Sequence, residues 1–279
     1  MKKIICLLVL AVFLLCTCAL RETEQEKPAQ PAASPEAVVE ETSQVTPEPT
    51  PEPTPEPTPE PTPEPTPEVS KFSLEGYTAE QIADFFCEVA LEQEYVHGDG
   101  DRTALKKWLQ PIRYTIYGSP TAEDLAVIES FVQQLNQIEG FPGMSPASTV
   151  VEENFVIRFL PWEEMSADAG YVVNGEYADG IAYWNYYNAN SELHNVRIWI
   201  RSDIDQYTRN SVILEEIVNS LGLGNDTVLR EDSIIYQYYS QPQALTEMDW
   251  LLMRLLYHKD MNSGIHQDEC RQVISNLCQ

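Results

Sequence analysis

Apolar residues recur at helical spacing in several segments of the chain, and most of these segments have a recognisable start or end. The run over 78–95 opens with Thr-Ala-Glu-Gln, which is an N-capping sequence. A second helix is predicted over 121–138, and a third over 210–221, where Gly222 acts as the C-cap. Aromatic and β-branched runs predict strands over 112–117, 155–160, 180–187 and 196–200. This order predicts an α+β or mixed α/β domain, with helices packed on a twisted sheet, over residues 71–279.

The first quarter of the chain has a different pattern. Residues 1–18 combine two lysines with a short apolar run, as a secretory signal does, and Leu-Cys-Thr-Cys resembles a bacterial lipobox with Cys18 as the acylated residue. Residues 19–70 are rich in Pro, Glu and Thr, and their Thr-Pro-Glu-Pro repeat predicts an extended polyproline tether. We therefore expect an extracytoplasmic, cell-surface lipoprotein of a bacterium, attached to the membrane by a lipid or an uncleaved signal anchor. Secretion is the alternative.

Charge limits the partners that this domain can have. The whole chain has a formal net charge of −27, and residues 71–279 hold 32 acidic and 13 basic side chains. Nucleic acids and anionic membrane surfaces are bound through basic surfaces, so we expect neither as a partner. Cationic partners or divalent ions are favoured instead.

Three cysteines, Cys87, Cys270 and Cys278, fall in the predicted domain. Cys270 and Cys278 are eight residues apart in a predicted C-terminal helix, about 12 Å along its axis, which is too far for a mutual disulfide. Cys87 could pair with either of them if the first and last helices meet. The pairing is left open.

The segment Ile-Leu-Glu-Glu-Ile-Val-Asn-Ser-Leu-Gly-Leu-Gly-Asn-Asp, residues 213–226, has the spacing of a metalloprotease helix without its histidines. In the pattern H-E-x-x-H-x-x-G-x-x-H, the three metal-ligand positions fall on Glu215, Asn219 and Asn225, and the general base falls on Glu216. One carboxylate with two asparagines is a poor ligand set for zinc, and it suits Ca²⁺ or no ion. We therefore expect no zinc site.

Two later segments extend this resemblance. Asp232-Ser233-Ile234-Ile235-Tyr236 stands where metzincins have the turn beneath the metal, and Leu-Thr-x-x-Asp followed by Leu-Tyr, residues 245–257, resembles their closing helix. Together with Lys107-Trp108 and Glu215-Glu216, these segments resemble a bacterial extracytoplasmic family of unknown function with a degenerate zincin-like fold. The resemblance covers roughly residues 105–265. It implies a zincin-like sheet with a backing helix, an active-site-type helix and a C-terminal helix, and it implies no established activity.

Several side chains are candidates for function. Glu216 could act as a catalytic base, although a structural role without the histidines is favoured. Asp226 could join it in an oxygen-rich site. Aromatic side chains could bind an extended peptide along an edge strand, stack on sugars or fill the core; they are Tyr183, Trp184, Tyr186 and Tyr236.

We accordingly expect a surface-tethered, catalytically degenerate zincin-like domain, a pseudoprotease, that binds a peptide or cell-wall ligand. A hydrolase that uses Glu216 and a non-zinc or weakly held metal on Glu215 and Asp226 is the first alternative. A purely structural envelope lipoprotein is the second.

Overall fold

The computed structural model describes residues 72–91, 101, 103–170, 177–187, 189–238 and 240–278. The predicted signal sequence (1–18), Cys18 and the predicted tether (19–70) lie outside the described residues. All described residues belong to one compact unit, Glu64–Gln279. Within that part of the chain, no helix is both long and apolar enough to cross a membrane.

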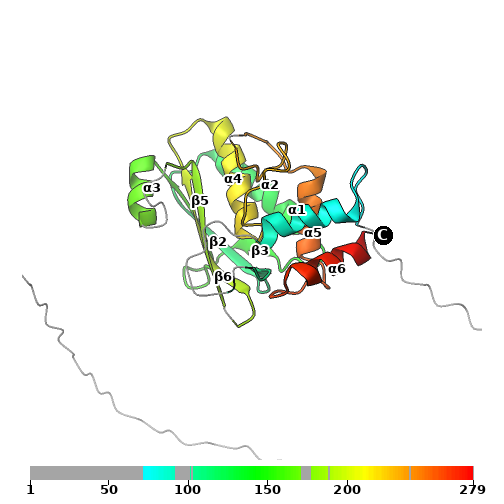
Figure 1. The fold of residues 1–279 in the computed structure, drawn as a ribbon. Helices are drawn as coiled ribbons and strands as arrows, with labels where there is room; N and C mark the ends of the chain where they lie inside the picture. Colours follow the sequence, from blue (N-terminus) through cyan, green and yellow to red (C-terminus); the bar gives the residue numbers. More distant parts are fainter. Residues whose placement is uncertain are drawn as a thin grey trace, which may run out of the picture. The chain divides into compact units, whose positions relative to one another are not determined.

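The described residues form a mixed α/β structure, which confirms the predicted fold class (Figure 1). The helices are α1 (Ala79–Leu91), α2 (Ala122–Leu135), α3 (Trp162–Ala169), α4 (Gln206–Ser220), α5 (Glu247–Leu256) and α6 (Gln267–Leu277). The strands are β1 (Lys107–Trp108), β2 (Ile112–Gly118), β3 (Met144–Pro146), β4 (Phe155–Leu160), β5 (Gly180–Tyr187) and β6 (Glu192–Arg201).

The sheet is mostly parallel, with the order β1-β6-β4-β2-β3. The exception is β5, which pairs with β6 in antiparallel orientation. Val196 of β6 lies opposite Phe155 of β4 and also opposite Trp184 of β5, so β4 and β5 occupy the two different sides of β6. Because no other described strand pairs with β5, it forms an edge of the sheet within the described residues.

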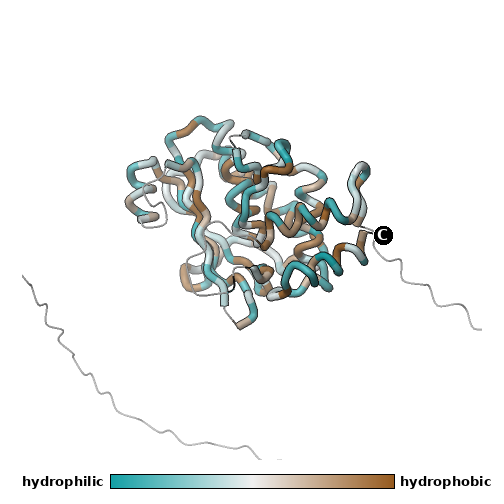
Figure 2. Tube along the Cα trace, in the orientation of Figure 1, coloured by the Kyte–Doolittle hydropathy of each residue, from teal (hydrophilic) through white to brown (hydrophobic). Residues whose placement is uncertain are grey.

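Helices cover both faces of this edge. In Figure 1, α3 lies on one side of β5 and α4 lies on the other. Ile181 and Tyr183 of β5 pack with Trp199 and α3 in a small cluster, whereas Ala182 and Trp184 face the main core. This alternation is the period of two expected for a strand buried on both faces. Figure 2 shows hydrophobic and hydrophilic stretches within the same helices, as expected for helices with one face in the core.

The structure corrects several element bounds. Helix α4 begins at Gln206, four residues before the predicted start, because Asp205 is its N-cap. Strand β6 begins at Glu192 rather than at 196, and α2 ends at Leu135 rather than at 138. The sequence did not predict β1, β3 or α3, which are two, three and eight residues long. Such short elements carry too few residues to show a period.

The first and last helices meet, as the cysteine argument required. Helix α1 packs against α6, and both Cys87 and Cys270 are buried. The three cysteines of the described domain form no disulfide with one another. Burial raises the pKa of Cys270 to about 12, with a smaller contribution from Cys87, so this thiol stays protonated at neutral pH.

Candidate functional site

Helix α4 holds the Glu215-Glu216 pair, and its start is fixed by local capping. The Asp205 carboxylate accepts hydrogen bonds from the Thr208 backbone N–H at 3.0 Å and from the Thr208 hydroxyl at 2.6 Å. An aspartate at this position satisfies a backbone donor that the helix itself cannot pair. The first turn of α4 is therefore specified by residues that are adjacent in sequence.

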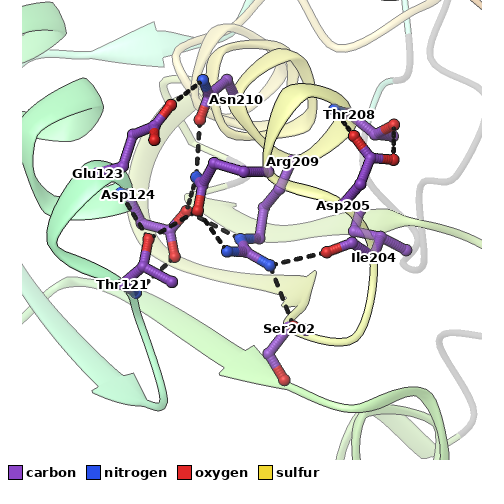
Figure 3. A network of polar contacts seen from close by, with 10 residues as sticks. Thr121, Glu123, Asp124, Ser202, Ile204, Asp205, Thr208, Arg209 and Asn210 are labelled. Carbon is purple, nitrogen blue, oxygen red and sulfur yellow. Dashed lines mark hydrogen bonds and ion pairs between the residues drawn. The ribbon is translucent and has the colours of Figure 1, made fainter.

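A buried ion pair then attaches this first turn to α2. The Arg209 Nε lies 2.8 Å from Asp124 Oδ1, and neither side chain is more than 5% exposed. Arg209 also donates to the carbonyls of Ser202 and Ile204, while Asp124 forms the capping box of α2 with Thr121 (Figure 3). Burial alone raises the pKa of Asp124, but the hydrogen bonds from Arg209 and Thr121 outweigh it and hold the pKa below its usual value. The network fixes the position of α4 on α2.

The other end of α4 is capped by aromatic side chains from distant parts of the chain. Trp108 Nε1 donates to the Ser220 carbonyl at 3.0 Å, and the Tyr257 hydroxyl donates to the Leu221 carbonyl at 2.8 Å. Gly222 follows with φ of +121°, and a Cβ there would overlap the Lys106 carbonyl oxygen. The predicted C-cap glycine is thus required both by its backbone conformation and by close backbone contact.

Glu215 and Glu216 lie on the part of α4 that faces β5 and the loop after the helix. Glu216 is 7% exposed and Glu215 is half-buried. Burial, together with smaller contributions from Asp226 and Asp179, raises the pKa of Glu215 to about 8. Burial also raises the pKa of Glu216 well above its usual value, with contributions from Glu215 and Asp226. At neutral pH the pair therefore carries protons that an exposed pair would release.

Glu216 lies directly beneath the first residue of β5. A Cβ on Gly180 would lie 2.5 Å from Glu216 Oε1 and 2.7 Å from its Cγ, so only glycine fits there. Gly180 and Asp179 were not predicted as site residues. A glycine at the start of an aromatic strand, as at Gly180, is a sequence signal that another segment packs closely against the backbone there. The sequence did not indicate that this segment is α4.

The two asparagines at the former ligand positions have different surroundings. Asn219 Oδ1 is buried and accepts no hydrogen bond. Asn225 Nδ2 donates to the Glu88 carbonyl at 3.0 Å, and its backbone N–H donates to the Val89 carbonyl at 3.1 Å. Asn225 therefore attaches the loop after α4 to the last turn of α1, whereas Asn219 stays on the face of Glu215, one helical turn away.

The aromatic candidates on β5 are packed rather than free. Tyr183 contacts the cluster under α3, and Trp184 and Tyr186 pack against the main core. Trp184 also lies against the loop after α4, because a Cβ on Gly224 would be 2.6 Å from its ring. Tyr186 lies under the Lys106 ammonium, 4.7 Å from the ring centroid. Because these rings pack against the core or α3, a ligand of β5 would contact mainly its backbone.

The ladder shows which peptide groups of β5 point away from β6. Asp179 lies opposite Arg201, and its carbonyl accepts the Arg201 N–H at 2.9 Å. Antiparallel pairs alternate between bonded and non-bonded, so the peptide groups of Ile181 and Tyr183 also face β6. Those of Gly180, Ala182 and Trp184 consequently point away from β6. An irregularity between Asn185 and Tyr186 ends this regular stretch.

Tyr236 and the predicted turn before α5 belong to a separate structural unit. Ser233 Oγ donates to Asp249 Oδ1 at 2.7 Å, while Asp249 also forms the capping box of α5 with Thr246. Tyr236 pairs with Thr227 in an isolated bridge and contacts the Tyr238 ring edge-on at 5.5 Å. This packing fixes the loop that carries Asp226, and it does not bring Tyr236 to the α4 carboxyls.

Two further observations concern possible ligand sites among the described residues. Among the described residues, no group of three or more His, Cys, Asp or Glu side chains is arranged to hold a metal ion. A separate pocket of about 580 Å³ lies between α1, the 229–232 loop and α5. Its lining includes Tyr77, Phe85, Leu229 and Glu231, and it contains none of the predicted site residues.

Comparisons with known proteins give a family and no activity. A family model described as "Protein of unknown function (DUF2927)" matches residues 79–276. No curated protein is similar enough to the chain to count as a relative.

Proposed function

The chain belongs to the DUF2927 family of proteins of unknown function, and we propose that its domain binds an extended peptide by adding it as a strand to β5. The observation that carries this proposal is the outward row of peptide groups at Gly180, Ala182 and Trp184. An unpaired strand edge offers hydrogen-bond donors and acceptors that an extended chain can complete.

A peptide fits this edge better than a sugar does. Carbohydrate binding would need an exposed aromatic face, but Tyr183, Trp184 and Tyr186 are half-buried and pack against α3 or the core. Backbone pairing requires no such face. An added strand would run between α3 and α4, where its alternate side chains would face each helix in turn.

We further propose that this scaffold is a zincin-like fold that has lost its metal. Support comes from the elements that follow α4: the close turn at Gly222, the turn held by Asp249 and the capped helix α5. Such a domain would retain peptide binding along the edge strand without hydrolysis.

The proposed setting is the outer surface of a bacterial cell. The signal-like segment, the candidate lipidation residue Cys18 and the proline-rich tether of residues 19–70 support it. In this arrangement the tether would extend the domain away from the membrane to reach peptides of the envelope. A Cys18→Ala variant that stays in the membrane fraction and carries the same lipid would contradict lipidation at this residue.

A hydrolase is the second candidate, and one observation favours it. Glu216 is a buried carboxyl with a strongly raised pKa, and such groups occur as catalytic acids or bases. A peptide or ester library would test it, with Glu216→Gln as the comparison. Turnover by the wild type that is lost in Glu216→Gln, while peptide binding persists, would establish the hydrolase. A purely structural envelope protein would show neither turnover nor binding.

The direct test of peptide binding uses a proline at the outward position 182. Because the Ala182 N–H points away from β6, Ala182→Pro removes a donor to the ligand while it keeps the ladder to β6. Ala182→Ser is the matched control, since it keeps the N–H. The full-length chain in detergent would be applied to an array of hexapeptides that vary around an alternating Thr-Val sequence.

We expect array binding by the wild type and Ala182→Ser, and a loss of tenfold or more in Ala182→Pro. The circular dichroism spectrum and the urea midpoint of all three proteins should agree. Equal binding by Ala182→Pro would exclude strand addition at this edge. A loss of binding in Leu229→Ser instead would place the ligand in the separate pocket under α1.

A further inference from the structure

The face of α4 beneath β5 has more hydrogen-bond acceptors than donors. Neither Glu215 nor Glu216 makes a hydrogen bond or ion pair with any described residue. Asn219 Oδ1 is also buried without a donor. Glu216 is only 7% exposed, so water has little access to compensate for the missing partner. These three side chains, within two turns of α4, therefore receive no hydrogen bond from another described residue.

The surrounding charges do not supply this donor. The electrostatic neighbours that act on Glu215 and Glu216 are Asp226 and Asp179, which are acids. Arg201 of β6 is already bound to Asp179 at 3.0 Å and to Asp203 at 2.9 Å. Apart from the protons of its own carboxyls, the site thus receives neither a hydrogen-bond donor nor a positive charge from another described residue, and it lies beside the outward edge of a strand.

We propose that the peptide bound along β5 carries a lysine or arginine whose cationic group is received by Glu215, Glu216 and Asn219. This inference rests on the proposed strand addition. Side chains of an added strand alternate between its two faces, so every second one is directed to α4. An ammonium or guanidinium group brings three to five N–H donors and a positive charge. It therefore supplies both of the properties that the site lacks.

A peptide cation explains the site better than a metal ion does. No described group of three acidic, histidine or cysteine side chains is arranged around a common point, as an ion would require. A long basic side chain needs no such symmetry, because its donors can reach acceptors along one helix face. Glu215 and Asn219 lie on that face, one helical turn apart.

The test pairs a substitution in the protein with one in the peptide. The probes are the acetylated and amidated hexapeptides Thr-Val-Lys-Val-Thr-Val and Val-Lys-Val-Thr-Val-Thr, together with versions that carry norleucine in place of lysine. Norleucine keeps the aliphatic stem and removes the charge. The proteins are the full-length wild type, Glu215→Gln, and Glu139→Gln, whose carboxyl is exposed and far along the chain from α4.

We expect the wild type to prefer one of the lysine peptides by tenfold or more over its norleucine version. Glu215→Gln should lose most of that preference and bind the norleucine peptide as the wild type does, while Glu139→Gln should keep it. The inference would be overturned if Glu215→Gln kept the full lysine preference of the wild type, or if Glu139→Gln lost as much of it as Glu215→Gln. Either result would show that lysine is attracted by the general negative charge of the protein. If the norleucine peptides bind without any preference for lysine, the inference fails while strand addition stands. If no peptide binds, strand addition itself is wrong.

Discussion

Replacing Glu215 with glutamine should make the stability of the domain less dependent on pH. The pKa of Glu215 is raised from 4.5 to about 8, chiefly by burial. The folded domain therefore holds this proton at pH values where the unfolded chain has released it. The stability that comes from this difference is fully present below pH 4.5 and is lost as the pH rises through about 8. Glutamine has no proton to lose, so Glu215→Gln should not show that decline.

The size of the effect follows from the shift. A change from 4.5 to about 8 corresponds to an upper limit of about 5 kcal/mol, at 1.36 kcal/mol per pKa unit. Glu215 is half-buried, and contact with water screens its charge, so we expect about 2 kcal/mol. Glu215→Gln should thus equal the wild type at pH 4.5 and exceed its unfolding free energy by about 2 kcal/mol near pH 9.

Urea unfolding at half-unit intervals from pH 4.5 to 9 measures this difference directly. The slope of free energy against urea should be the same for both proteins, because the surface exposed on unfolding does not change. Glu139→Gln, at an exposed position, should track the wild type throughout. A constant difference between Glu215→Gln and the wild type at every pH would refute the burial argument for this carboxyl.

Three other substitutions test the supports of α4. Tyr257→Phe leaves the buried Leu221 carbonyl without its donor and should cost about 1–3 kcal/mol, seen as a lower thermal midpoint; an unchanged midpoint would contradict the cap. Gly222→Ala places a methyl group against the Lys106 carbonyl at a positive φ and should cost about 3 kcal/mol or more by urea unfolding, whereas a cost below 1 kcal/mol would be inconsistent with this geometry. Asp124→Ala leaves Arg209 buried without its carboxylate and should lower the free energy of unfolding in urea by about 3–5 kcal/mol. An unchanged free energy of unfolding would show that the ion pair does not fix α4 on α2.

The parts of the fold that depend on adjacent residues could be predicted from the sequence. The capping box of α5 joins Thr246 and Asp249, which are three residues apart, and the sequence indicated it directly. Gly222 was predicted as the end of α4 from the same kind of local signal. The strand at 180–187 matches β5 because aromatic and β-branched residues suit a pleated surface.

The parts that join distant residues could not be predicted in this way. Trp108 reaches the Ser220 carbonyl across 112 residues, and no local pattern encodes that pairing. The same is true of Arg209 and Asp124, which are 85 residues apart. For the candidate site, the sequence identified Glu215 and Glu216 but not the position of Glu216 under Gly180. It also predicted the aromatic residues of β5 without revealing that their rings pack inward and leave the backbone edge open.

Amide hydrogen exchange along β5 tests strand addition most directly. The outward N–H groups of Ala182 and Trp184 have no partner strand among the described residues, whereas those of Ile181 and Tyr183 face β6. Exchange would be followed by NMR in the full-length chain, before and after saturation with the tightest-binding hexapeptide of the array. We predict that the peptide slows exchange at Ala182 and Trp184 by tenfold or more and leaves Ile181 and Tyr183 nearly unchanged. Equal exchange at Ala182 and Trp184 with and without bound peptide would contradict binding at this edge.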